Sequence, residues 1–456
     1  MKLITWVGAA VALLVPGLAL AAAAGSFAGP AIGPVPLEFV FFAVVLAGVA
    51  LFHHHTLPIA VGGAIFIALY KILFSPFKTG AGLAGLAGHV GHEWVILLNL
   101  LLLLLGFALL ADLFEKSEVP AMLPRFMPDD WKGCFVLLAL VFVLSSFLDN
   151  IAAAMIGGAV ANTVFKGRVH IGYLAAIVAA SNGGGAGSVV GDTTTTMMWI
   201  AGISPLEVLE AFIASGVALV VFGIPASLQQ HGHQPIQKDA DPNVRIDWTR
   251  VGIVAFILVS AITVNVVVNT RFNAVSDRFP FLGAAVWLAI LATAALRAPN
   301  WSLLPGATKG SVFLLSLVLC ASMMPVEQLP VASWQTAFAL GFTSAVFDNI
   351  PLTALALKQG GYDWGFLAYA VGFGGSMIWF GSSAGVALSN MFPQARSVGQ
   401  WLRHGWHVAL AYVVGFFVML AMIGFHPGPA PRGSLAAEPV AAPALAAPAA
   451  AAPVTK

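Results

Sequence analysis

The sequence predicts an all-α polytopic membrane protein with about ten transmembrane helices and two re-entrant hairpins, arranged as two inverted-topology repeats. Three observations lead to this fold class. Hydrophobic residues make up 59% of the 456 residues and charged residues only 9%, whereas a soluble domain carries about 25% charged residues. Apolar stretches long enough to cross a bilayer recur along most of the chain. An Asp-Asn pair followed by a glycine-rich segment occurs once in each half.

The two ends of the chain differ from the rest in composition. Residues 1–21 combine Lys2, an apolar run and a small-residue cleavage site, which is typical of a signal peptide; an uncleaved first helix is the alternative. Residues 427–456 are rich in Ala and Pro and predict a disordered tail. The net charge of +1 gives no reason to expect a nucleic-acid partner. Cys134 and Cys320 lie in apolar segments, so we expect packing roles for them and no cofactor.

Eight apolar segments predict ordinary membrane spans. They are Pro36–Phe52, Leu57–Phe74, Trp94–Phe114, Pro205–Ala226, Val251–Thr270, Phe281–Leu296, Ser311–Met324 and Trp406–Phe425. We expect these regions: N-terminal scaffold helices at 36–93, a first repeat at 94–227, connecting scaffold helices at 250–309 and a second repeat at 310–426. We expect His89 and His92 in a solvated outer loop and Glu93 at a membrane edge.

Four further apolar segments do not have the form of single spans. The segments 133–165 and 331–357 are each expected to form a hairpin around a central Asp-Asn pair. The segments 170–203 and 362–392 are helical patterns interrupted by clusters of glycine and serine, which oppose a continuous helix. Irregular backbone at membrane depth occurs only where it is buried in protein or lines a cavity. Matching interrupted segments in two halves therefore indicate the binding site of a transporter.

The distribution of Lys and Arg favours hairpins over full crossings. With the mature N-terminus outside, returning hairpins place twelve basic residues in the cytoplasm and seven outside, with Lys2 completing the 20. Full crossings reverse the ratio, and basic residues favour the cytoplasmic side. Because the first hairpin then enters from the cytoplasm and the second from the periplasm, the two halves are inverted. The C-terminal tail is also expected in the periplasm.

Asp149 and Asp348 are the residues in which we expect the chemistry to lie. A carboxylate within the hydrocarbon region costs several kcal/mol unless it is paired, protonated or hydrated. Each is followed by an amide, Asn150 or Asn349, and helix dipoles converge at a hairpin tip. Carboxylate, amide and carbonyl oxygens could hold Na⁺, and the same carboxylate could bind a proton when the cation leaves. The alternative is that each aspartate caps a helix near the membrane surface.

Asp192 follows the first glycine-rich stretch and precedes four threonines. Its carboxylate could share the first cation site or cap the second half of the broken helix, and the residues leave both open. Thr193 and Thr194 could ligate a cation, although threonine hydroxyls in membrane helices more often bond to their own backbone. The second half has Ser382 and Ser383 at the corresponding place, so the two half-sites are expected to differ in charge.

These motifs resemble the signatures of NhaD-type sodium/proton antiporters of the ion transporter superfamily. The first-half resemblance is carried by Ser145–Asn150 and by Asn182–Trp199, and the second by Asp348–Thr353 and Gly374–Gly385. It covers roughly residues 94–425. Gly187 and Val189 stand where the family has an aromatic residue and a proline. The start of the chain and Phe52-His53-His54-His55 resemble a related branch of citrate transporters.

The resemblance implies a homodimer in the bacterial inner membrane, with a static scaffold and a moving transport part. It predicts a transporter of small ions, not an enzyme, that exchanges Na⁺ for H⁺; cation-coupled transport of citrate or a related carboxylate is the alternative. The anion-carrying relatives typically have Ser-Asn-Thr at the hairpin tips, where this chain has aspartate. The full set of expected binding residues is Asp149 and Asp348 as alkali-cation ligands, with Asn150, Asn182, Asp192, Thr193, Thr194, Asn349, Thr353, Ser376, Ser382 and Ser383.

Overall fold

The chain is an all-α polytopic membrane protein. A computed structural model describes residues 29–431 except 34, 53–54, 123–124, 126, 238–244 and 273–277. The expected signal peptide at 1–21, His53, His54 and most of the expected tail lie outside the described residues. Six described helical segments are long and apolar enough to span a membrane: 56–74, 82–115, 205–233, 248–268, 301–322 and 406–423.

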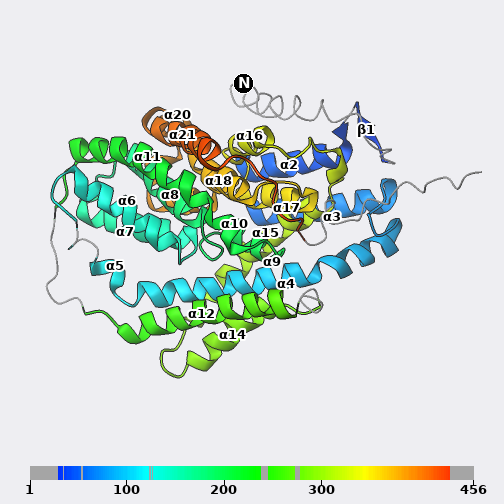
Figure 1. Ribbon diagram of the computed structural model, residues 1–456, viewed down its shortest axis with the longest axis horizontal. Helices are drawn as coiled ribbons and strands as arrows, with labels where there is room; N and C mark the ends of the chain where they lie inside the picture. Colours follow the sequence, from blue (N-terminus) through cyan, green and yellow to red (C-terminus); the bar gives the residue numbers. More distant parts are fainter. Residues whose placement is uncertain are drawn as a thin grey trace, which may run out of the picture.

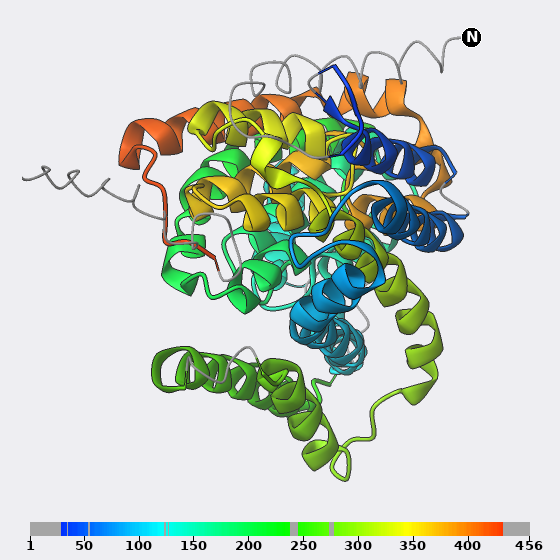
Figure 2. The ribbon, with the colours of Figure 1, turned by 90° about the vertical axis from the view of Figure 1, so that its right-hand side faces the viewer.

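The elements fall into two groups of helices that pack mainly within themselves (Figure 1, Figure 2). The scaffold group comprises α2 (Leu37–Leu51), α3 (Thr56–Phe74), α4 (Gly82–Glu115), α12 (Trp248–Arg271), α14 (Phe281–Thr293) and α15 (Leu304–Ser322), with the 3₁₀ turns η2 (Trp301–Leu303) and η3 (Val326–Gln328). A short hairpin of β1 (Ala31–Ile32) and β2 (Val35–Pro36) precedes α2.

The core group contains both Asp-Asn segments and both glycine-rich segments. Its elements are α6 (Trp131–Ser145), α7 (Asn150–Val164), α8 (Ile171–Ala186), α9 (Thr193–Ile200), α10 (Pro205–Leu209), α11 (Ala211–His233), α16 (Trp334–Ser344), α17 (Asn349–Gln359), α18 (Trp364–Gly374), η4 (Gly375–Met377), α19 (Ser383–Met391), η5 (Pro393–Arg396), α20 (Val398–His404) and α21 (Trp406–Ile423). The short α5 (Val119–Met122) connects the scaffold group to α6.

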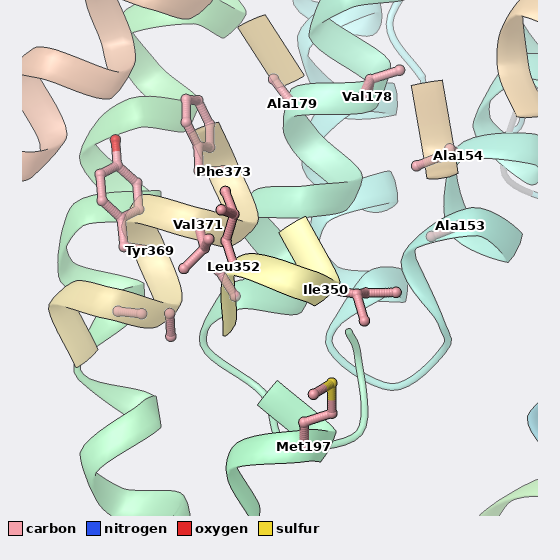
Figure 3. Packing of buried hydrophobic residues seen from close by; sticks show 14 of the residues in the cluster. Ala153, Ala154, Val178, Ala179, Met197, Ile350, Leu352, Tyr369, Val371 and Phe373 are labelled. Carbon is pink, nitrogen blue, oxygen red and sulfur yellow. The ribbon is translucent and has the colours of Figure 1, made fainter. Parts of the chain in front are cut away.

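The two halves of the chain share one interior. Ala153 and Val178 come from the first half and Ile350 and Phe373 from the second, and all four are buried in the same packed region (Figure 3). Helix α18 contacts α8, and α19 contacts α7 and α8. Small and large apolar side chains thus interdigitate across the halves, which fixes the glycine-rich segments relative to each other.

The prediction of a solvated loop before the third span is wrong. Helix α4 begins at Gly82 and runs through residue 93, across the expected boundary between scaffold and first repeat. His89 is 7% exposed, and its Nε2 lies 2.9 Å from Oγ of Ser322 on α15. Glycine content suggested a loop, but Gly85 lies against the backbone of Gly80, so it serves close packing at a helix start.

The first helix break lies later in the chain than its glycine cluster suggests, and the second lies between its two glycine clusters. Helix α8 continues to Ala186, so Asn182 is helical, and the break runs from Gly187 to Asp192. In the second half α18 and η4 continue to Met377. The glycines before each break are buried within helices, where their lack of a side chain lets neighbouring helices approach closely.

Candidate functional site

Four helices of the core group begin at the hairpin tips or just after the breaks, and a polar side chain caps the first turn of each. Asp149 accepts a hydrogen bond from Ile151 N at the start of α7, and Asp348 accepts one from Ile350 N at the start of α17. Asp192 caps α9 and Ser382 caps α19. Capping, the alternative interpretation of the aspartates, is therefore present. The caps of each half also lie close together. Asn150, next to the cap Asp149, bonds to the cap Asp192. Ser383, next to the cap Ser382, bonds to the cap Asp348.

A buried hydrogen-bond network joins the first half to the second. Asn150 Nδ2 donates to Asn182 Oδ1 and to Asp192 Oδ2, each at 3.0 Å. Asn182 Nδ2 in turn donates to Ser376 Oγ at 2.9 Å and to Ser382 Oγ at 3.0 Å. All five residues are at most 5% exposed. Asn182 is the central member of this network, because it bonds to Asn150 of the first half and to two serines of the second.

Asp192 serves both as a cap and as a member of this network. Its Oδ1 accepts from the backbone N of Thr194 at 2.8 Å and from Thr194 Oγ1 at 2.9 Å, while Oδ2 faces Asn150. The carboxylate is 2% exposed. A buried carboxylate needs such donors, since burial without hydrogen bonds is costly. The capping role is thus observed, whereas the expected role of Asp192 in a cation site stays a prediction.

Asp348 lies at the wall of a pocket. Its Oδ2 accepts from Ser383 Oγ at 3.3 Å, which links the second hairpin to the second broken helix. The pocket has a volume of about 250 Å³ and is also lined by Ile151, next to the first Asp-Asn pair. Thr56 and Asn390 also line it. Both are polar residues that the sequence analysis did not single out, because nothing in their local pattern marks them.

The three carboxylates of the site act on one another electrostatically. Asp192 interacts with Asp149 and with Asp348. Among the described residues none of the three is ion-paired with Lys or Arg. Nor does any group of three His, Cys, Asp or Glu side chains in the described part of the chain lie close enough to hold a metal ion. A cation here would thus be held by single carboxylates with amide, hydroxyl and carbonyl oxygens.

The same close packing recurs at both breaks. A Cβ on Gly191 would meet the carbonyl oxygen of Ser145, at the end of α6. A Cβ on Gly381 would meet the carbonyl oxygen of Ala345, just after α16. Both glycines directly precede a capping residue, Asp192 or Ser382. Each break therefore lies directly against the first helix of its own hairpin, in a position that only glycine fits.

The network does not include every expected ligand: within the described residues no side-chain hydrogen bond joins it to Asp149, Asp348, Ser383, Thr193, Asn349 or Thr353. The hydroxyl of Thr353 bonds to Asn349 O one turn earlier, as threonines in helices commonly do. For Thr193 and for the side chain of Asn349, no hydrogen bond is recorded within the described residues, although both are buried. The sequence analysis missed Thr195 and Thr196, whose hydroxyls bond to Asp192 O and to the backbone of the break.

The fold and site together define a polytopic membrane protein with one buried and two half-buried carboxylates beside its hairpin tips and its first break. No protein-family model matches the chain. It is similar to "Sodium/proton antiporter 1" of Arabidopsis thaliana, with 28% identity over 322 residues that cover 63% of this chain and 53% of the relative. The chain thus spans about half the length of the curated relative it matches. The printed name of this relative describes a sodium/proton antiporter.

Proposed function

We propose that the protein is a secondary transporter that exchanges Na⁺ for H⁺ by alternating access, at a site formed by Asp149, Asp192 and Asp348. The observation that carries this proposal is geometric: Asp149, Asp192 and Asp348 cap helices at the two hairpin tips and the first break, and among the described residues none of them is ion-paired with Lys or Arg. Carboxylates that repel one another release that repulsion when one of them binds a cation or a proton. Competition between Na⁺ and H⁺ for the same group is sufficient for exchange. The similarity to a sodium/proton antiporter is consistent with this chemistry.

The charge of the site argues against a carboxylate substrate. Helix N-termini attract anions, and four of them begin near this site. In this chain, however, three of those N-termini already face an aspartate. A citrate or related anion would meet these negative charges, and no Lys or Arg of the described part of the chain is paired with them. A cation is the better complement.

The contacts at the ends of the molecule support re-entrant hairpins in inverted repeats. Asp247 N donates to Ser117 O at 2.9 Å, and Asn300 Nδ2 donates to Asp112 Oδ1 at 3.2 Å. Returning hairpins put these four residues on the same side of a membrane, whereas full crossings would separate 112–117 from 247 and 300. We propose that this side is cytoplasmic in a bacterial inner membrane, because the positive-inside count favours it. The homodimer remains part of the same proposal.

Flux in everted vesicles tests the proposed exchange. Addition of Na⁺ should release protons from vesicles that contain the wild-type protein. The response should disappear in Asp149→Asn and in Asp348→Asn, which keep a capping oxygen but lose the charge. Labelled citrate uptake that survives both substitutions, without a response to Na⁺, would overturn the proposal in favour of carboxylate transport.

A further inference from the structure

The scaffold and core groups touch mainly toward one end of the molecule. The broadest contact between them is that of α15 with α17, and η3 also contacts α17. Glu93 of α4 and Lys358 in the last turn of α17 lie at this end. We call it the Lys358 end. The opposite end, where α3 begins at Thr56 and α19 finishes beside Asn390, is called the Asn390 end.

A buried ion pair joins the two groups at the Lys358 end. Nζ of Lys358 is paired with Oε1 of Glu93, and the two side chains are only 16% and 4% exposed. Glu93 belongs to the scaffold group and Lys358 to the core group. Nearby, His89 of α4 is bonded to Ser322 of α15, which holds the scaffold side of this contact. A buried pair of this kind depends on both partners, because removing one leaves the other charge buried and uncompensated.

The pocket at Asp348 lies toward the other end. Its walls come from both groups, with Val49 and Thr56 from the scaffold and Ser383 and Asn390 from the core. Asn390 is exposed, whereas Thr353, one turn along α17 from Asp348 toward Lys358, is completely buried. The path from Asp348 to solvent therefore runs toward the Asn390 end, while packed side chains and the ion pair close the Lys358 end.

We propose that the Glu93–Lys358 pair is the contact that keeps the Lys358 end closed, so that in this structure Asp348 is reached only from the Asn390 end. This inference rests on the proposed exchange by alternating access. When access switches, α17 must separate from α4, and both charges become hydrated. Removing one charge destabilises only the closed arrangement, since the remaining charge is buried there and hydrated once the end opens.

Thiol labelling from each side of the membrane tests this inference. The parent carries Cys134→Ala and Cys320→Ala, with Ala387→Cys as a reporter on the pocket wall. A membrane-impermeant maleimide is applied to vesicles of either orientation. The parent should be labelled from the Asn390 side. In Glu93→Gln and in Lys358→Met, labelling from the Lys358 side should rise about tenfold, the effect of a 1.4 kcal/mol shift in the equilibrium.

Two controls distinguish the effect of breaking the Glu93–Lys358 pair from the effect of losing any charge at this end. The double variant Glu93→Gln/Lys358→Met leaves no unpaired charge, so its labelling from the Lys358 side should rise less than in either single variant. Lys78→Gln removes an exposed ion pair with Glu327 at the same end and should leave labelling unchanged. If the single variants do not fold, the exchanged pair Glu93→Lys/Lys358→Glu should fold and keep the labelling pattern of the parent.

Two results would overturn the inference: equal labelling of the parent from both sides, or unchanged labelling in folded single variants. The inference would also be overturned if the exchanged pair folds and is labelled from the Lys358 side as fast as from the other side. A different result would reject the proposed Na⁺/H⁺ exchange but not the one-sided closure. In that result, wild-type vesicles show no Na⁺-triggered proton release, although the parent is labelled from one side only.

Discussion

Asn182 offers the most direct test of whether the buried network holds the two halves together. The substitution Asn182→Ala removes three hydrogen bonds, one accepted from Asn150 and two donated to Ser376 and Ser382. Each bond contributes about 0.5–1.5 kcal/mol net, so the loss sums to about 1.5–4.5 kcal/mol. Asn150 keeps its bond to Asp192, which limits the penalty of an unpaired donor. We expect destabilisation of about 2–4 kcal/mol.

The neighbouring Ser181 provides a matched control. It is also completely buried on α8, but its hydroxyl bonds only to Val178 O of the same helix. Ser181→Ala should therefore cost about 1 kcal/mol or less. Unfolding of both variants in mixed micelles of detergent and SDS measures the difference. Proton release in vesicles should fall in Asn182→Ala, because Asn150 loses one of the two acceptors that orient it beside Asp192.

The substitution Asn182→Asp separates hydrogen bonding from charge. Its oxygens can still accept from Asn150 and from the two serine hydroxyls, which rotate freely. The new charge lies beside Asp192, however, so we expect lower stability at neutral pH that recovers as the medium is acidified and one carboxylate is protonated. If Asn182→Ala is no less stable than Ser181→Ala, the network does not hold the two halves together and this reasoning is refuted.

Three further predictions follow from single contacts. Gly191→Ala should lower stability by about 1–3 kcal/mol, because the added methyl group would overpack against α6. Gly216→Ala on α11 has open space around it and should be neutral or stabilising. Equal melting temperatures of the two variants would contradict this prediction. The hydrogen bond from Arg297 lowers the pKa of Asp247, so Asp247→Asn should lower the melting temperature at pH 7. The difference should shrink as the pH falls below about 4 and vanish only below the lowered pKa of Asp247; a constant difference would contradict it. Ser382→Asp should fold, because Ser382 already accepts two N–H donors, and should alter the pH at which flux is half-maximal; an unaltered pH profile would contradict that role.

The sequence was sufficient to predict the class of fold and to single out Asp149 and Asp348, although their observed capping role was only the alternative interpretation. Asp149 and Asp348 could be found because a carboxylate in a membrane segment costs free energy and therefore indicates a functional role. The exact position of each break was not predictable. Glycine lowers helix propensity, but Gly183 and Gly184 lie in α8, where close packing outweighs propensity.

Contacts between distant segments could not be predicted from local pattern. Glu93 and Lys358 are 265 residues apart, and each by itself has the pattern of an ordinary charge at a membrane edge. Likewise, Asn182 could be identified as a candidate from the family resemblance, but not as the residue that joins the halves. Both outcomes depend on how α4, α8, α17 and α19 pack together, which is information that no single segment contains.

The two breaks share a backbone geometry but differ in charge, and this difference bears on how one site could serve two ions. Gly191 and Gly381 make equivalent approaches to the hairpins, and each precedes a cap. The first cap is Asp192, which is charged, and the second is Ser382, which is neutral. If both caps were charged, Asn150 would donate to one carboxylate and Asn182 to the other, and the network would carry a second negative charge. With one serine, the hydroxyl accepts from Asn182 without adding charge, so the network stays intact whether or not a cation is bound. Such an arrangement lets the occupancy of the carboxylates change during transport while the contact between the halves is kept.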